Sequence, residues 1–287
     1  MMRWANYRII HNISNPWIKV SCQNTFAEGD KGYSVTIGKK NNTFMSFGNV
    51  NYVNAVNNSQ LTSPKLRLNC LPEPYCGDPD ANVYCLNMNP GEPDSLFDNT
   101  LVNNLYFQRA KDNLQHKVSS AFWTEGLVMS KSIIYSAPIL FEYLLDKKTR
   151  PVYSIHEGAK WQREKTKELR VWLNGRNPNI FFLEYFPYHS KFGFDFPDFL
   201  PSYEYRNALL EFAMNEEKII IIMRKEKKWY DIQDRTFGDI GNRLRDYKKK
   251  IILKYGQGGW LTRNNMTLPI PNSRCDCLTW NDIIRVI

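Results

Sequence analysis

The sequence predicts an α/β fold, with three layers, α/β/α, around a central and mostly parallel sheet of four strands. Three observations predict it: short apolar runs that end in turn residues, helical spacing of apolar residues between the later runs, and an apolar content of 43% over 287 residues. Strands of a parallel sheet are buried on both faces and are therefore continuously apolar. Strands that alternate with amphipathic helices form βαβ units.

The first predicted strand starts at Val83 and ends at the turn Asn89-Pro90-Gly91, whose proline and glycine permit neither continued strand nor immediate helix. The other three predicted strands are, in order, 180–183, 219–223 and 251–253.

Two amphipathic helices are predicted between the later strands, at 204–216 and 237–247. The long connection between the first two strands contains two more apolar helical stretches, 105–114 and 134–145. We expect these two stretches to cover the sheet faces and to help wall a pocket.

Residues 1–78 are rich in Asn, Ser and Thr and contain two β-like pieces, 17–22 and 33–37. They lack the charge bias and low hydrophobicity of a disordered tail. We interpret them as an irregular N-terminal elaboration packed on the core, and residues 79–287 as the α/β domain.

The chain carries a formal net charge of +9, which indicates an anionic partner such as nucleic acid. Its basic residues fall in three clusters that contain or adjoin Tyr153, Trp229 or Tyr247; the clusters are Lys147, Lys148 and Arg150; Arg224 to Lys228; and Arg243, Arg245 and Lys248 to Lys250. No apolar run is long enough to cross a bilayer and no signal peptide is apparent, so we expect a cytoplasmic, monomeric protein.

The six cysteines and four histidines show no metal-site spacing and no disulfide framework for a chain of this size. Cys85, inside an apolar run, is interpreted as a small core residue. The sequence therefore predicts neither a metal nor another cofactor.

All parallel strands end on the same edge of a sheet, and ligands bind there. The predicted edge comprises 87–91, 184–189, 223–225 and 254–259, which combine amides, a carboxylate, a histidine, cations and glycines. Asn89 is held at this edge. The alternative interpretation of this segment is an ordinary βα turn in which Asn89 is only a capping residue.

Two of these strand ends resemble the uracil-DNA glycosylase superfamily. Asn87-Met88-Asn89-Pro90-Gly91 is similar to the Gly-Met-Asn-Pro-Gly first motif of the single-strand-selective monofunctional enzymes and to the related turn of the mismatch-specific enzymes. The segment 181–187 is similar to the strand that reads the flipped base and ends in an Asn, two residues and a Pro. The similarity covers only disconnected pieces of the chain.

The resemblance implies hydrolysis of an N-glycosidic bond after base flipping, without a cofactor. Asn89 would orient the attacking water, Glu92 would act as base or electrostatic support, and His189, the only histidine on the predicted edge, would supply a cation to the departing base. The implied contacts to the base come from five side chains: Asn87, Met88, Phe97, Glu184 and Tyr188.

The departures from the family pattern concern the base. Asn87 replaces the first glycine of the motif and narrows the approach of the ligand. Glu184 replaces the base-reading Asn, and an ionised Glu can only accept hydrogen bonds. It would repel uracil O4 but accept from cytosine N4, which favours a modified cytosine such as the hydroxymethylated or glucosylated base of phage DNA. A protonated Glu184 would restore uracil recognition, so a uracil-excising repair enzyme remains an alternative.

The family's His-Pro-Ser type loop is absent. Two segments can take its place, 254–260 with its glycines and aromatics, or 271–274 nearer the C-terminus. The candidate DNA-binding residues on them are Lys254, Tyr255, Gln257, Trp260, Asn272, Ser273 and Arg274.

A second hypothesis is a non-catalytic binder of modified or single-stranded nucleic acid on the same fold. A third, an unrelated α/β hydrolase or nucleotide enzyme, lacks support because no Gly-x-Ser-x-Gly or P-loop motif occurs. The glycosylase hypothesis requires Asn89 and Glu184 to face one cavity.

Overall fold

The structure is a computed structural model. It describes residues 2–21, 23–37, 43–58, 66–68, 70–91, 105–118, 128–130, 134–135, 153–154, 164–175, 178–190, 196–253, 260–266, 278 and 280–287.

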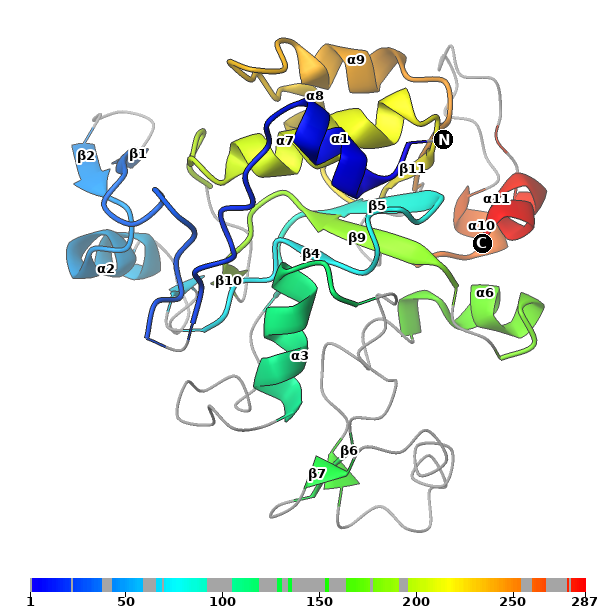
Figure 1. Cartoon of the computed structure of the whole chain (residues 1–287), viewed down its shortest axis with the longest axis horizontal. Helices are drawn as coiled ribbons and strands as arrows, with labels where there is room; N and C mark the ends of the chain where they lie inside the picture. Colours follow the sequence, from blue (N-terminus) through cyan, green and yellow to red (C-terminus); the bar gives the residue numbers. More distant parts are fainter. Residues whose placement is uncertain are drawn as a thin grey trace.

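A five-stranded sheet forms the centre of the molecule, in the order β12, β11, β5, β9, β4 (Figure 1). These strands span Lys250–Ile252, Ile219–Ile222, Val83–Asn87, Ile180–Glu184 and Tyr75–Cys76. The first four are parallel to one another and match the four predicted strands, which confirms an α/β fold with a mostly parallel sheet. β4 pairs antiparallel with β9, and its two residues are too few to be recognised as an apolar run.

Each face of the sheet packs against a different set of helices (Figure 1). Tyr84 and Leu86 of β5 belong to one buried cluster, whereas Val83 and Cys85 belong to another, as the alternation along a strand requires. The helices that contribute to the first cluster include α1 (Trp4–Ile10), α7 (Tyr203–Asn215), α8 (Glu226–Tyr230) and α9 (Ile240–Asp246). Those of the second are α6 (Lys167–Trp172), α10 (Arg263–Met266) and α11 (Trp280–Val286).

Among the four parallel strands, the path of the chain through the sheet reverses direction once. The chain moves from β5 to the neighbouring β9, then crosses back over β5 to β11 and continues to β12. Crossovers of the same hand in opposite directions place their helices on opposite faces, which explains why α6 lies opposite α7 and α9. Ligands of open α/β sheets bind at such a reversal. Here it brings together the loops that follow β5 and β11.

Two predicted helices are confirmed as α7 and α9, with small shifts at their ends. α9 begins at Ile240 instead of 237 because Asp239 caps it, accepting a hydrogen bond from the Asn242 N–H. Upstream, Asp234 holds the N–H groups of Thr236 and Phe237 in a turn. No helix in the described ranges has the length and apolar character needed to span a bilayer.

The connection between β5 and β9 is predicted in part. α3 (Leu105–Leu114) covers the predicted stretch 105–114 and is tied to the β4 edge by Asn113, whose side chain bonds the Tyr75 carbonyl and the Gly77 N–H. The predicted helix at 134–145 is wrong at its start, where a β-branched and an aromatic residue form a strand, and residues 136–145 lie outside the described ranges. The small sheet there contains β6 (Val128–Ser130), β7 (Ile134–Tyr135) and β8 (Tyr153–Ser154).

The N-terminal region contains, besides α1, the antiparallel pair β1 (Ser34–Ile37) and β2 (Thr43–Ser46), then α2 (Val50–Asn58) and β3 (Leu66–Arg67), which pairs with β10 (His189–Ser190). The β-like piece predicted at 33–37 is present as β1. The piece predicted at 17–22 is wrong, because residues 16–19 form a turn. Asn15 Oδ1 accepts from the Trp17 N–H, and the Trp17 carbonyl accepts from the Val20 N–H, so these groups do not join a strand ladder.

Asp30 joins the N-terminal region to the start of α7. Its buried carboxyl accepts hydrogen bonds from the Ser202 N–H at 2.9 Å, the Ser202 hydroxyl at 2.7 Å and the Tyr188 hydroxyl at 2.7 Å. Burial raises the pKa of Asp30 to about 6, while these hydrogen bonds act in the opposite direction.

Asp30→Ala is expected to lower the free energy of unfolding by about 2–4 kcal/mol, because it leaves three buried donors without an acceptor. Urea unfolding at neutral pH measures the effect. Asp198→Ala, which removes an exposed carboxyl four residues before Ser202, is the matched control. Equal stability of the two variants would contradict the bridging role of Asp30.

Candidate active site

The carboxyl ends of β5 and β9 place Asn87 beside Glu184. The two residues are register partners in the parallel pair, and Asn87 Nδ2 donates to Glu184 Oε1 at 3.0 Å. Asn87 is 5% exposed and Glu184 is 8% exposed. The other oxygen of each side chain, Asn87 Oδ1 and Glu184 Oε2, is buried without a hydrogen-bond partner in the described structure. Two buried polar atoms without partners, at the carboxyl ends of neighbouring strands, are what a binding site for a polar ligand requires.

A second buried carboxyl, Glu73, lies near Glu184. Backbone hydrogen bonds of 2.9 Å hold the two segments together, from the Glu184 N–H to the Pro74 carbonyl and from the Glu73 N–H to the Pro187 carbonyl. Burial raises the pKa of Glu73 to about 8. Burial also raises the pKa of Glu184 to about 8; the Glu73 charge adds to this, while the Asn87 hydrogen bond and the Arg224 charge oppose it.

At neutral pH, Glu184 is therefore a carboxylic acid. Because Oε1 accepts from Asn87, we assign the proton to Oε2, which becomes a donor, while Asn87 Oδ1 remains an acceptor. Turning the Asn87 amide over would exchange these roles and still leave one donor and one acceptor. The sequence-based assumption of an ionised, accept-only Glu184 thus does not describe the folded protein at neutral pH.

Asn89 lies two residues beyond β5, as predicted, and is anchored through its amide nitrogen. Asn89 Nδ2 donates to the carbonyl oxygen and to the hydroxyl of Ser190, both at 2.9 Å. Because a carbonyl oxygen can only accept, these bonds fix the orientation of the amide. The partly exposed Asn89 therefore offers its Oδ1 as an acceptor for water, and no other group in the described ranges occupies that oxygen.

His189 lies behind this loop and is neutral at pH 7. Its ring is buried, with Nδ1 3.1 Å from the Gly91 carbonyl, and burial lowers its pKa to about 4. The expected role as a cation for the departing base does not fit this environment. The ring instead joins the Asn89 loop to β10, together with the hydrogen bond from the Ser190 N–H to the Gly91 carbonyl.

Tyr188 and Met88 are both buried in the hydrophobic core. Tyr188 is fully buried, donates to Asp30 and accepts from the Ala27 N–H, so its hydroxyl is engaged in the N-terminal core. The Met88 side chain is 8% exposed and belongs to the cluster under α7. Both residues were predicted from the resemblance; the Tyr188 hydroxyl is already engaged by Asp30 and Ala27, whereas Met88 packs in the core to the same extent as Glu184.

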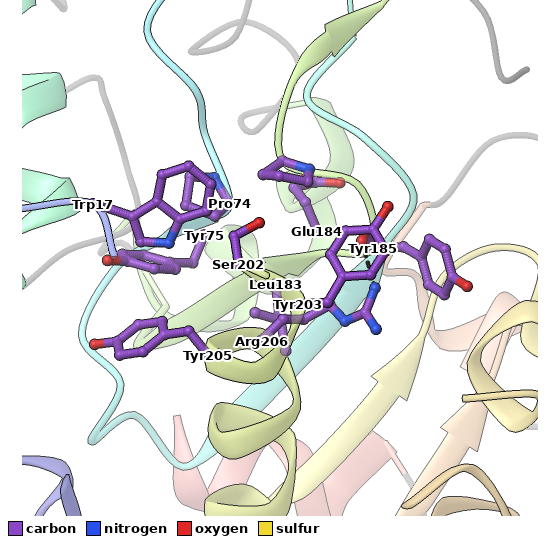
Figure 2. A pocket seen from close by; sticks show the side chains of 11 residues that line it. Trp17, Pro74, Tyr75, Leu183, Glu184, Tyr185, Ser202, Tyr203, Tyr205 and Arg206 are labelled. Carbon is purple, nitrogen blue, oxygen red and sulfur yellow. Dashed lines mark hydrogen bonds between the residues drawn. The ribbon is translucent and has the colours of Figure 1, made fainter. Parts of the chain in front are cut away.

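A small cavity of about 10 Å³ lies between the end of β9 and α7, about the space that one water molecule requires. Glu184 lines it, together with Arg206, Ser202 and aromatic side chains (Figure 2). Asn89 does not line it. The requirement that Asn89 and Glu184 face one cavity is thus not met by this cavity, although the two residues lie on adjoining strand ends.

Arg206 positions the backbone next to Glu184, and sequence reasoning missed it. Its guanidinium donates to the Tyr185 carbonyl at 2.7 Å and is stacked on the rings of Tyr185 and Tyr203, at 4.5 and 4.1 Å from their centroids (Figure 2). A cation three residues after Tyr203 and four before Leu210 lies on the apolar face of α7, and this spacing was the available signal. Glu73, between two prolines directly before β4, was also missed.

The predicted basic clusters are only partly available for a ligand. Trp229 is fully buried against Tyr185 and cannot stack on a base. Arg243 pairs with Glu211 and Lys249 with Glu217, each at 2.7 Å. Trp260, by contrast, is 41% exposed. The remaining predicted site residues lie outside the described ranges: Glu92, Phe97, Lys254, Tyr255, Gln257, Asn272, Ser273 and Arg274, together with Lys147, Lys148 and Arg150.

The described part of this edge offers one hydrogen-bond donor, Glu184 Oε2, and one acceptor, Asn87 Oδ1. The oriented amide of Asn89 can accept a hydrogen bond from water. Within the described ranges, no three His, Cys, Asp or Glu side chains gather in a way that could hold a metal ion. No family model matches the chain, and neither a curated protein nor a solved structure is significantly similar to it.

Proposed function

We propose that this protein is a monofunctional DNA glycosylase that hydrolyses the N-glycosidic bond of a flipped, modified cytosine. The observation that carries the proposal is the Asn87–Glu184 pair at the end of β5 and β9, with Asn89 two residues away. A buried donor next to a buried acceptor is complementary to the edge of a nucleobase. The net charge of +9 supports DNA as the partner.

In the proposed reaction, a water molecule accepted by Asn89 Oδ1 attacks the sugar C1′. The new bond joins the water oxygen to C1′, the bond from C1′ to the base breaks, and its electron pair leaves with the base, which takes up one proton from the water. An abasic site remains. A neutral Asn89 cannot stabilise a positive sugar, so the rate depends on stabilising the leaving base by hydrogen bonds, as from Glu184 Oε2–H.

With Glu184 protonated, the Asn87–Glu184 pair can form hydrogen bonds with either pyrimidine. Cytosine presents N4–H and N3 to an acceptor and a donor, and uracil presents N3–H and O4. Where Glu184 faces position 4 of the ring, its ionisation separates the two bases, because a carboxylate accepts from N4–H of cytosine but repels O4 of uracil. Modified cytosine is therefore the base compatible with both protonation states, and uracil is the alternative substrate.

The experiment is to incubate the protein with phage DNA containing glucosylated hydroxymethylcytosine and, separately, with DNA containing uracil, and then to cleave abasic sites with alkali. We expect strand breaks in the modified phage DNA. Breaks only in the uracil DNA would overturn the substrate, and breaks in neither would overturn the glycosylase.

A second candidate function, non-catalytic binding of modified or single-stranded nucleic acid, is favoured by the small size of the cavity beside Glu184. A base cannot enter about 10 Å³, so glycosylase action requires this edge to open around the nucleotide. A binder requires no such opening. Retention of biological activity by an Asn89→Ala protein would favour the binder.

A further inference from the structure

One lysine at the carboxyl edge of the sheet has an unusual backbone conformation. Lys225 has φ 52° and ψ 50°, in the left-handed region that residues with a Cβ atom disfavour. Four other non-glycine residues in the described ranges have positive φ, and each lies two residues beyond the end of a helix, where this conformation commonly closes the last turn: Asn12, His116, Asn174 and Glu217. Lys225 instead follows a strand, β11. Glycine would form the same turn at lower cost, so a lysine here indicates a role for its side chain.

Lys225 and Asn89 follow neighbouring strands of the sheet. In the parallel pair of β5 and β11, Ile222 is the register partner of Leu86, and the Met223 N–H donates to the Leu86 carbonyl at 2.9 Å. Lys225 and Asn89 each come three residues after this register pair. Because neighbouring strands are about 4.8 Å apart, the two residues leave the same edge of the sheet at adjoining positions. This is the point where the chain path reverses and where open α/β sheets bind ligands.

The Lys225 side chain is available to an anion. It is exposed, and it makes neither an ion pair nor a hydrogen bond with the parts of the chain that the structure describes. Lys249, by contrast, is paired with Glu217. A lysine carries a compact charge on a flexible stem and is a common ligand of phosphate groups. A flipped nucleotide stays joined to its two phosphates, so a cation that leaves the sheet next to Asn89 can meet one of them.

We propose that Lys225 binds the phosphodiester adjoining the nucleotide whose sugar faces Asn89. The ammonium group pairs with a phosphate oxygen and holds the DNA backbone while the base lies against the Asn87–Glu184 pair. Lys225 is thus a binding residue and takes no part in breaking the N-glycosidic bond. The inference rests on the proposed function for the position of that nucleotide.

The test measures binding of a fluorescein-labelled DNA duplex that contains one hydroxymethylcytosine, by fluorescence anisotropy from about 50 to about 200 mM salt. Lys225→Gln is expected to weaken binding and to reduce the slope of log K against log salt by about 0.9, the value for one phosphate contact in a duplex. Its loss of affinity relative to the unmodified protein is therefore expected to narrow about 3-fold over this range. Lys225→Arg keeps the charge and is expected to keep the slope.

Two further variants separate a charge contact from a structural role. Lys225→Gly removes the cation from a backbone conformation that glycine favours, so we expect it to fold, as checked by urea unfolding, and to show the same reduced slope. Lys248 is an exposed lysine two residues before β12, at the amino end of that strand and thus at the opposite edge of the sheet. Lys248→Gln is the matched control and is expected to leave the slope unchanged. An unchanged slope in Lys225→Gln, or the same change in Lys248→Gln, would overturn the assignment.

A second probe locates the contact on the DNA. Each of the two phosphates that flank the hydroxymethylcytosine is replaced in turn by an uncharged methylphosphonate. At one of the two positions we expect the replacement to weaken binding of the unmodified protein but not of Lys225→Gln, because the variant has no contact there to lose. Equal weakening of both proteins at both positions would overturn the placement of Lys225 beside this nucleotide.

Failure of this assignment is distinguishable from failure of the proposed function. If no DNA loses a base but the salt slope depends on Lys225, the phosphate contact stands and the glycosylase is wrong. If abasic sites form and Lys225→Gln keeps the full slope, the glycosylase stands and the phosphate contact is wrong.

Discussion

Asn89→Ala is expected to reduce the rate of base release by at least about 10²-fold, while DNA binding is retained. Asn89 is anchored to Ser190 by two hydrogen bonds, so its Oδ1 is a fixed acceptor for the attacking water. Loss of a positioned reactant costs this much even when the rest of a site is intact. The measurement is the single-turnover rate of abasic-site formation, with binding followed by anisotropy.

Two variants separate this role from a merely structural one. Ser190→Ala removes one of the acceptors of Asn89 Nδ2 but leaves Oδ1, so we expect an intermediate loss of rate. Asn54→Ala changes an exposed Asn of α2 and is expected to leave the rate unchanged. If Asn89→Ala releases base as fast as Asn54→Ala, the proposed role of Asn89 is wrong.

Glu184 is expected to confer a pH dependence on uracil release that is absent for modified cytosine. Burial raises the pKa of Glu184 to about 8, so the donor at Oε2 is present below about pH 8 and is lost as the pH rises through that value. At position 4 of the ring, uracil O4 needs this donor, whereas cytosine N4–H can donate to the ionised form. Rates from about pH 6 to about pH 9.5 measure the difference.

Variants of the two carboxyls sharpen this prediction. Glu184→Gln keeps a permanent donor and is expected to remove the fall of uracil release above pH 8, whereas Glu184→Ala loses about 10²-fold with either base. Glu73→Gln removes a charge that raises the Glu184 pKa, so the midpoint is expected to move to lower pH. Glu204→Gln, at an exposed position of α7, is the control. A midpoint unchanged in Glu73→Gln, or a pH profile unchanged in Glu184→Gln, would contradict the assignment.

Much of the fold was readable from local patterns. The four runs at 83–86, 180–183, 219–223 and 251–253 are continuously apolar, and burial on both faces of a parallel sheet is the physical reason. The turn at Asn89 was placed correctly at a strand end because Pro90 and Gly91 restrict the conformation of their own backbone. This effect is local and does not depend on distant residues. The turn at residues 16–19 was missed because Asn15 determines it through its side chain.

What the sequence determined by itself was therefore the set of strands, the edge on which they end and the presence of Asn89 and Glu184 on that edge. Only the tertiary structure decided their chemistry. Glu184 is neutral because it is buried beside Glu73, and Tyr188 is engaged because Asp30 reaches it from a distant part of the chain. Burial and long-range hydrogen bonds depend on residues far apart in sequence, and these set which groups carry protons and which remain free to bind a ligand.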